Sequence, residues 1–176
     1  MFGVIVVTAI LLAVPFVAMQ FTNEVDWSAG DFIIMGALIF GTGLSFVLVM
    51  RYATHFLYRA AIGLALGTTF FMIWANLAVG LIGSGPHLGN FMYIAVVAVA
   101  VIGALRSRLK AAKMQQAMYY TAMSLILLAV IALIARMDQY PGSSVAEILG
   151  VNGFFAVLYV LSGEFFRAAA KEQSSQ

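Results

Sequence analysis

The chain has 176 residues, of which 64% are hydrophobic and 9% are charged, and its mean hydropathy is +1.03. A soluble domain carries about 25% charged residues to cover its surface, so this composition excludes an ordinary soluble protein and indicates a membrane protein. The lack of cysteine excludes disulfides, thiolate nucleophiles and cysteine-ligated iron–sulfur or zinc sites. The net charge of +2 does not indicate nucleic-acid binding, because Lys and Arg gather at the ends of apolar runs.

Six apolar runs predict an all-α, polytopic bundle of transmembrane helices, at 1–19, 32–50, 60–83, 91–105, 117–135 and from the 144–147 segment to about 166. The first run lacks the early positive charge and the cleavage site of a secretory signal. We therefore expect a retained helix in which Pro15 introduces a kink, with a cleaved signal as the alternative. We expect residues 1–166 to form a single six-helix domain and residues 167–176 to form a polar cytoplasmic tail.

The connections between the runs carry signals of helix starts and of orientation. Ser28 with Asp31, and Ser144 with Glu147, have the spacing of a capping box. Residues 84–90 predict a tight turn. Cytoplasmic loops carry the excess of basic residues, and one side of the predicted bundle holds Arg51, Arg59, Arg106, Arg108, Lys110, Lys113, Arg167 and Lys171, whereas the other side holds Arg136. This asymmetry predicts that both termini are cytoplasmic.

Side chains that could carry chemistry are scarce in this sequence. Glu164 is the carboxylate deepest in a predicted helix, and Arg167, three residues later, can pair with it near the membrane surface. His55 and His87 fall in turns on opposite sides of the bilayer, so they cannot ligate one haem between them. The sequence contains no convincing nucleophile–base pair, phosphate loop or dinucleotide fingerprint. We therefore expect no catalytic residue, no metal, no cofactor and no enzyme activity.

A G-x-x-x-G pattern at Gly63 and Gly67 lies near the start of the 60–83 run. Small residues at this spacing let helices approach closely in lipid. The two glycines are therefore a candidate helix-packing face, either within the chain or between subunits.

Two amides, Asn76 and Asn152, are the strongest candidates for a polar site. Both lie near the outer ends of their predicted helices, and a rise of about 1.5 Å per residue puts them at a similar depth. A buried amide in hydrocarbon needs partners, and each could supply the other's. One interpretation is thus a helix-locking pair, and the alternative is a shallow, outward-opening pocket lined by these amides with Trp74 and Glu147. The expected stripe of the third helix on the side of Asn76 contains Thr69, Gly80 and Gly83.

Three segments carry a resemblance to a known family. They are Trp27 with Asp31 and Phe32, the sequence WANLAVGLIG at 74–83, and EILGVNGFF at 147–155. Together with the basic turn after the fourth run, they resemble an uncharacterised family of small six-span bacterial inner-membrane proteins. The resemblance implies a bacterial inner-membrane location and carries over no activity, cofactor or site.

Three classes of function fit these observations. The first is a non-catalytic accessory subunit or homo-oligomeric scaffold in a membrane complex, which short loops, a nearly charge-free interior and small-residue faces favour. The second is a conduit or carrier for a neutral or weakly polar small solute, with an outward-facing polar site. The third, a membrane-embedded lipid-active enzyme, ranks last because it needs acid–base or metal groups. The expected partners are the lipid bilayer and other membrane-protein subunits or further copies of the chain, with no nucleic acid.

Overall fold

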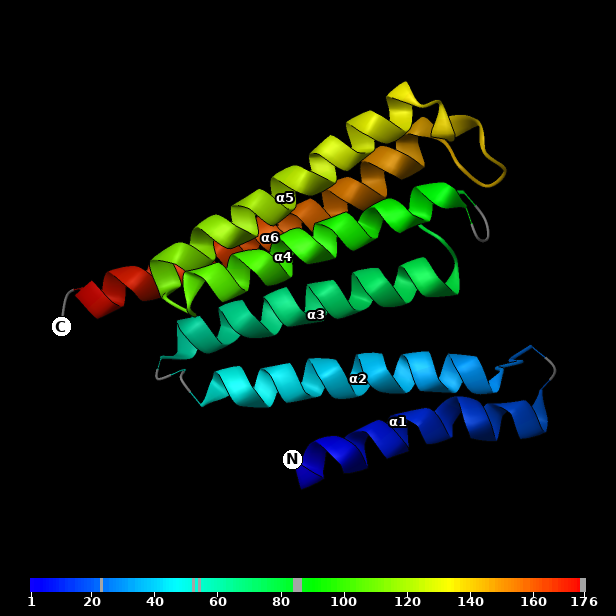
Figure 1. Cartoon of the computed structure of the whole chain (residues 1–176), viewed down its shortest axis with the longest axis horizontal. Coiled ribbons are helices and arrows are strands. Elements are labelled where there is room, and N and C mark those ends of the chain that lie inside the picture. Colours follow the sequence, from blue (N-terminus) through cyan, green and yellow to red (C-terminus); the bar gives the residue numbers. More distant parts are fainter. Residues whose placement is uncertain (23, 52, 54, 84–86, 175–176) are drawn as a thin grey trace. The chain divides into compact units, whose positions relative to one another are not determined.

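The computed structural model describes residues 1–22, 24–51, 53, 55–83 and 87–174, and helices dominate that part of the chain (Figure 1). Among these residues, six helical segments are long and apolar enough to cross a membrane. The predicted all-α class with six such helices is confirmed. The helices are α1 (Phe2–Phe21), α2 (Ala29–Met50), α3 (Phe56–Ala78), α4 (Met92–Ser107), α5 (Ala111–Ile134) and α6 (Val145–Ser174), with short 3-10 helices η1 (Leu88–Phe91) and η2 (Met137–Gln139).

Two helix ends differ from the sequence-based expectation. Helix α3 ends at Ala78 rather than near residue 83, because Gly80 and Gly83 adopt left-handed backbone angles, with φ of 78° and 70°. The expected stripe that continued along α3 to these two glycines is therefore wrong. Helix α6 continues to Ser174, so residues 167–174 extend the helix, which was expected to end near residue 166. Of the predicted 84–90 turn, residues 84–86 lie outside the described part of the chain.

The chain forms two compact units, an N-terminal unit (Met1–Tyr52) and a C-terminal unit (Ala53–Gln176), where the sequence analysis treats residues 1–166 as one domain. In the N-terminal unit, α1 and α2 approach through glycines of α2: a Cβ placed on Gly43 would lie 3.0 Å from a methyl of Val4. The predicted capping box is confirmed, since Ser28 and Asp31 exchange side-chain-to-backbone hydrogen bonds at the start of α2. No residue of α1 or α2 is buried.

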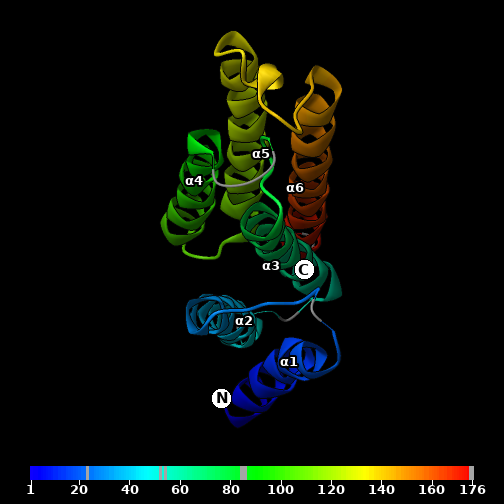
Figure 2. The ribbon, with the colours of Figure 1, turned by 90° about the vertical axis from the view of Figure 1, so that its right-hand side faces the viewer.

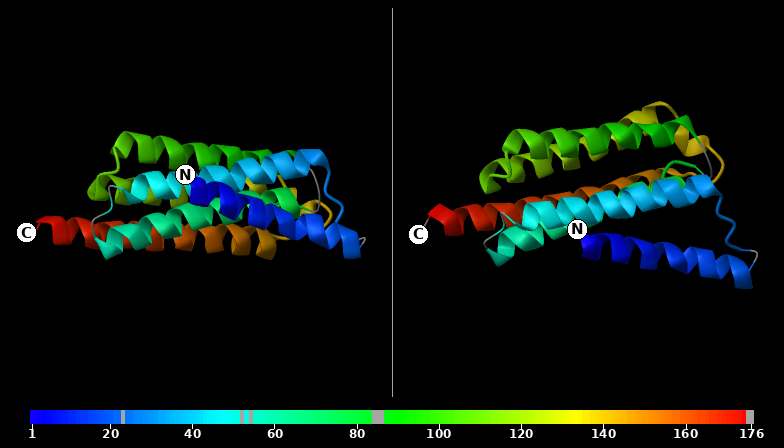
Figure 3. Two further views of the ribbon diagram at one scale, coloured as in Figure 1. Left: turned by 90° about the horizontal axis from the view of Figure 1, so that it is seen from below. Right: turned by 60° about the horizontal axis from the view of Figure 1, so that its bottom comes forward.

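The C-terminal unit is a four-helix arrangement whose ring order is α3, α6, α5, α4 (Figure 2). Helix α6 contacts both α3 and α5, and α4 contacts α5, but α3 and α4 contact each other at few positions. The C-terminal turns of α6 extend past the neighbouring helix ends (Figure 3). Three pairs of neighbouring helices in the ring are thus closely packed, whereas the fourth pair, α3 and α4, is not.

Glycines allow neighbouring helices of the C-terminal unit to approach closely. A Cβ on Gly103 of α4 would lie 2.8 Å from the Cβ of Ala117, and one on Gly163 of α6 would lie 2.6 Å from the Tyr119 ring. The candidate packing residue Gly67 is instead exposed, and a Cβ there would meet nothing within 4 Å. The buried face of α3 consists of Tyr58, Ala61, Ile62, Ala65, Thr68 and Met72. Within the C-terminal unit Gly67 therefore packs on no other helix, and a subunit interface involving Gly63 and Gly67 stays a prediction.

Substitution by alanine should change stability in opposite directions at a glycine packed against another helix and at an exposed glycine. Gly103→Ala places a methyl group against the Ala117 side chain and backbone, so we expect it to lower the unfolding free energy by about 1–3 kcal/mol through overpacking. Gly67→Ala meets no neighbour and should raise stability by up to about 1 kcal/mol through helix propensity. Thermal unfolding of the detergent-solubilised variants measures both. A Gly103→Ala protein as stable as wild type would contradict the close α4–α5 contact.

Candidate functional site

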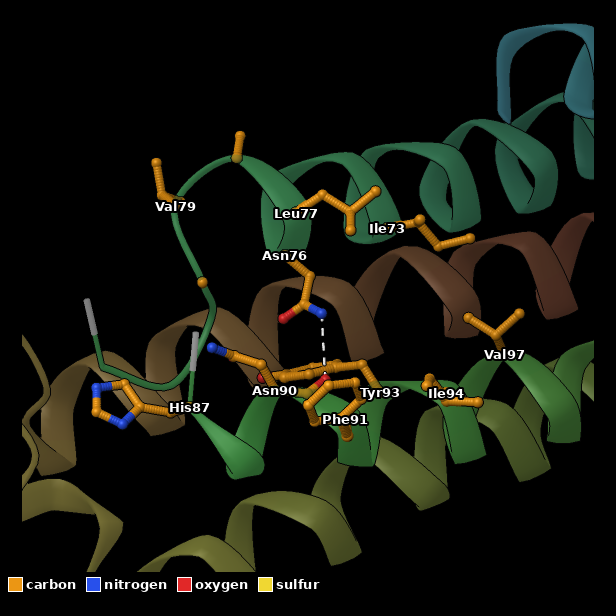
Figure 4. Close-up of a pocket in the computed structure, with 12 residues that line it drawn as sticks. Ile73, Asn76, Leu77, Val79, His87, Asn90, Phe91, Tyr93, Ile94 and Val97 are labelled. Atoms are coloured by element: carbon orange, nitrogen blue, oxygen red, sulfur yellow. Dashed lines mark hydrogen bonds between the residues drawn. The ribbon is translucent and has the colours of Figure 1, made fainter. Parts of the chain in front are cut away.

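A cavity of about 630 Å³ lies between the C-terminal end of α3 and the N-terminal part of α4 (Figure 4). This volume is within the range of roughly 300–1,000 Å³ that is usual for small-molecule pockets. The cavity lies where α3 and α4, neighbours in the ring, make few contacts with each other, because α3 packs on α6 and α4 packs on α5. Its described lining is Ile73, Asn76, Leu77, Ala78, Val79, Gly80, His87, Asn90, Phe91, Tyr93, Ile94 and Val97.

The side chain of Asn90 organises the connection beside the cavity. Its Oδ1 accepts hydrogen bonds from the backbone N–H groups of Leu81 and Ile82, both at 2.9 Å, and its Nδ2 donates to the carbonyl of Ile82 at 3.3 Å. An amide can do this because it offers a donor and an acceptor on one short side chain. Asn90 is buried, and it pairs backbone groups of the connection after α3, which lie outside any helix. The sequence analysis treated it only as part of a turn.

Asn76 lies in the last turn of α3 and reaches toward α4 (Figure 4). Its Nδ2 donates to the backbone carbonyl of Asn90 at 3.1 Å. Since a carbonyl only accepts, this bond fixes which end of the amide faces α4. The Oδ1 atom of Asn76 is buried without a hydrogen-bond partner, a condition that it shares, among the described residues, with Ser143 Oγ in the connection before α6. Leaving a buried acceptor unpaired costs about 1–3 kcal/mol.

Asn152 is fully buried in α6 and finds its partners elsewhere. Its Nδ2 donates to the carbonyl of Ile148 at 2.8 Å, and its Oδ1 accepts from the hydroxyl of Tyr93 at 3.3 Å. The predicted direct pairing of Asn76 with Asn152 is therefore wrong. The physical reason is the ring order: the chain returning into α4 brings the Asn90 carbonyl to one amide and the Tyr93 hydroxyl to the other. The two amides are joined only indirectly, through α4.

The remaining residues of the expected pocket lie outside the cavity lining. Trp74 is 40% exposed and stacks on Phe71, with ring centroids 5.9 Å apart. Glu147 is exposed in the first turn of α6, where its backbone N–H donates to Ser144 Oγ at 3.1 Å. Of the four residues in that prediction, Asn76 lines the cavity and Asn152, Trp74 and Glu147 do not.

Hydrogen bonds between uncharged groups connect the helices away from the cavity. The hydroxyls of Thr69 and Tyr159 lie 2.7 Å apart between α3 and α6, and Ser162 Oγ donates to the carbonyl of Ala61 at 2.8 Å between the same helices. Tyr58 of α3 donates to the carbonyl of Leu109 at 2.5 Å, just before α5. Thr69 was expected on the stripe beside Asn76, but the other three residues carried no sequence signal, because a Tyr, Thr or Ser within an apolar run is common in membrane helices.

The ionisable groups singled out from the sequence lie apart from the cavity, with one exception. The predicted ion pair is confirmed, since Arg167 Nη1 lies 3.4 Å from Glu164 Oε2, and Tyr119 also donates to Glu164. His55 precedes α3 at the opposite end from the cavity. His87 lines the cavity and stacks on Tyr140, with ring centroids 4.9 Å apart. Within the described part of the chain, no three or more His, Asp or Glu residues gather in a way that could hold a metal.

No family model, curated protein or solved structure matches the chain. The chemistry of the site therefore follows from its own lining. None of the described lining residues is Asp, Glu, Lys or Arg. Such a cavity can bind an uncharged molecule by apolar contact and hydrogen bonds.

The Tyr93–Asn152 hydrogen bond should behave as a coupled pair. Tyr93→Phe leaves the Asn152 Oδ1 atom without its hydroxyl partner, so we expect a loss of about 1 kcal/mol of unfolding free energy. Asn152→Leu should also destabilise, and the double variant should lose less than the sum of the two losses. Tyr120→Phe, at an exposed tyrosine of α5, is the matched control and should be neutral. Strictly additive losses in thermal or denaturant unfolding would rule out the coupling.

Proposed function

We propose that this chain is a non-catalytic membrane protein that acts through contacts with other membrane proteins, as an accessory subunit or a homo-oligomeric scaffold. The observation that carries the proposal is the hairpin of α1 and α2, in which no residue is buried although both helices are strongly apolar. Apolar helices that bury so little within their own hairpin can pack against other helices in the membrane. The lack of charged residues in the described lining of the cavity supports a role without catalysis.

Helix α2 offers one face that suits a second protein. Gly36 and Gly43 face side chains of α1, at 3.2 Å and 3.0 Å from a placed Cβ. Ala37, Gly41 and Ser45, spaced four residues apart, are exposed, and a Cβ on Gly41 would meet nothing within 4 Å. Small residues at this spacing let a partner helix approach closely in lipid, where van der Waals packing rather than the hydrophobic effect drives association.

We infer a bacterial inner-membrane location with both termini cytoplasmic. The resemblance of residues 74–83 and 147–155 to small inner-membrane proteins supports the location. The basic residues around the α4–α5 connection and at the end of α6, with only Arg136 on the predicted outer side, support the orientation. In this orientation the cavity lies toward the outer side of the membrane.

The test is the native mass and composition of the protein after gentle extraction from its own membrane. We expect a discrete species larger than the 18.9 kDa chain, containing either a second protein or further copies. Gly41→Leu should reduce that species, because it places a large side chain on the exposed small-residue face. Gly150→Leu, where a Cβ also meets nothing within 4 Å, is the control on α6 and should leave the species intact. A monomer under every mild condition would refute the proposal.

A second candidate is a conduit or carrier for a neutral or weakly polar solute, and the cavity beside Asn76 favours it. Asn76→Leu separates the two functions. In a scaffold it should leave the native species intact and change only the unfolding temperature. In a carrier it should leave the fold intact and abolish exchange of the co-purifying small molecule in proteoliposomes. If stability, assembly and solute exchange were all unchanged, Asn76 would have no part in either the scaffold or the carrier function. A lipid-active enzyme ranks below these candidates, because the described lining contains no Asp, Glu, Lys or Arg and the described residues hold no metal-binding cluster.

A further inference from the structure

The cavity between α3 and α4 has an apolar part and a polar end, and the two suggest a class of ligand. We infer that it binds one amphiphile from the bilayer, a single-chain molecule whose uncharged head group donates a hydrogen bond, as a long-chain alcohol does. The chain would lie between α3 and α4, and the head group would lie beside Asn76. This inference is independent of the scaffold function proposed above.

The apolar part of the cavity is formed by one edge of each helix. Ile73 and Leu77 lie four residues apart on α3, and Ile94 and Val97 lie three residues apart on α4, so each pair follows one helix face. Leu77 is 54% exposed and Ile94 is 62% exposed, which shows that the cavity is open at the apolar surface of the C-terminal unit. A hydrocarbon chain can therefore enter from lipid without crossing a polar barrier.

The polar end lies at the depth where an amphiphile's head group would be. Asn76 belongs to the last turn of α3, and the backbone of Gly80 and the side chains of His87 and Asn90 complete this end of the cavity. The ends of membrane helices lie near the level of the lipid head groups. A ligand that enters along Ile73 and Val97 with its chain pointing toward the membrane centre thus brings its head group to Asn76.

The free acceptor on Asn76 selects for a donor. Its Nδ2 is occupied by the Asn90 carbonyl, whereas its Oδ1 has no partner among the described residues. The terminal torsion of asparagine is broad, so rotation about it can turn Oδ1 toward a hydroxyl in the cavity. A charged head group is disfavoured, because no described lining residue carries a compensating charge and burying an unpaired ion is costly.

The test compares three probes of equal chain length on the detergent-solubilised full chain by native mass spectrometry. Hexadecan-1-ol donates a hydrogen bond, 1-methoxyhexadecane does not, and hexadecanoate at alkaline pH is an anion. We expect saturable binding of one hexadecan-1-ol per chain and binding of the ether that is weaker by about three- to tenfold. Binding of the anion should be weaker than that of the alcohol. Non-saturating adducts, or equal binding of alcohol and ether, would overturn the inference.

Two variants locate the site and the hydrogen bond. Val97→Trp fills the apolar part of the cavity and should abolish alcohol binding, whereas Ile102→Trp, at an exposed position of α4 outside the described lining, should not. Asn76→Leu should remove the preference for alcohol over ether while ether binding persists. Equal losses in the two Trp variants, or a preference that survives in Asn76→Leu, would contradict this site. Thermal unfolding of each variant confirms that it is folded before binding is compared.

Discussion

The hydrogen bonds of the Asn90 side chain determine how the chain leaves α3 and enters α4. By accepting from two successive backbone N–H groups at Leu81 and Ile82, the amide closes the turn that the left-handed Gly80 begins. The same residue offers its own carbonyl to Asn76. The helix ends are therefore linked through this polar group, while the bodies of α3 and α4 pack on α6 and α5. A cavity follows from that arrangement, because the connection holds the two helices near each other without making them pack together.

Lipid as a solvent explains why neutral groups connect the helices elsewhere. An ion in hydrocarbon is costly, and a backbone polar group there needs a partner within the protein. The C-terminal unit meets both conditions with tyrosine, threonine and serine hydroxyls, such as Tyr159 with Thr69 and Ser162 with the Ala61 carbonyl. Each such bond contributes only about 0.6 kcal/mol on average. Van der Waals contact among the buried side chains, including the close approach at Gly103 and Gly163, therefore adds to the stability.

What could be predicted from the sequence was the part that depends on residues near one another in the chain. The six apolar helices, the capping box at Ser28 and the Glu164–Arg167 pair follow from composition or from a spacing of three residues, and the structure contains them. The candidate site could be predicted only in part. Gly67 and Gly103 both lie within apolar stretches of sequence, yet within the C-terminal unit only Gly103 faces another helix. That difference, like the separate partners of Asn76 and Asn152, depends on the ring order of the helices, which local patterns do not encode.

The unpaired oxygen of Asn76 is informative because it is an exception. Buried polar atoms in proteins are almost always hydrogen-bonded, so an orphan within an apolar bundle needs a physical reason. Packing alone gives none, since a leucine of similar size at this position would avoid the cost of the orphan at the loss of one hydrogen bond to Asn90. The orphan lies at the polar end of a cavity whose walls along α3 and α4 are mostly apolar and whose mouth is exposed. A molecule that fills the cavity and donates one hydrogen bond would pair the Asn76 oxygen and cover the apolar walls of the cavity. A purely structural role for Asn76 explains neither the unpaired oxygen nor the cavity beside it.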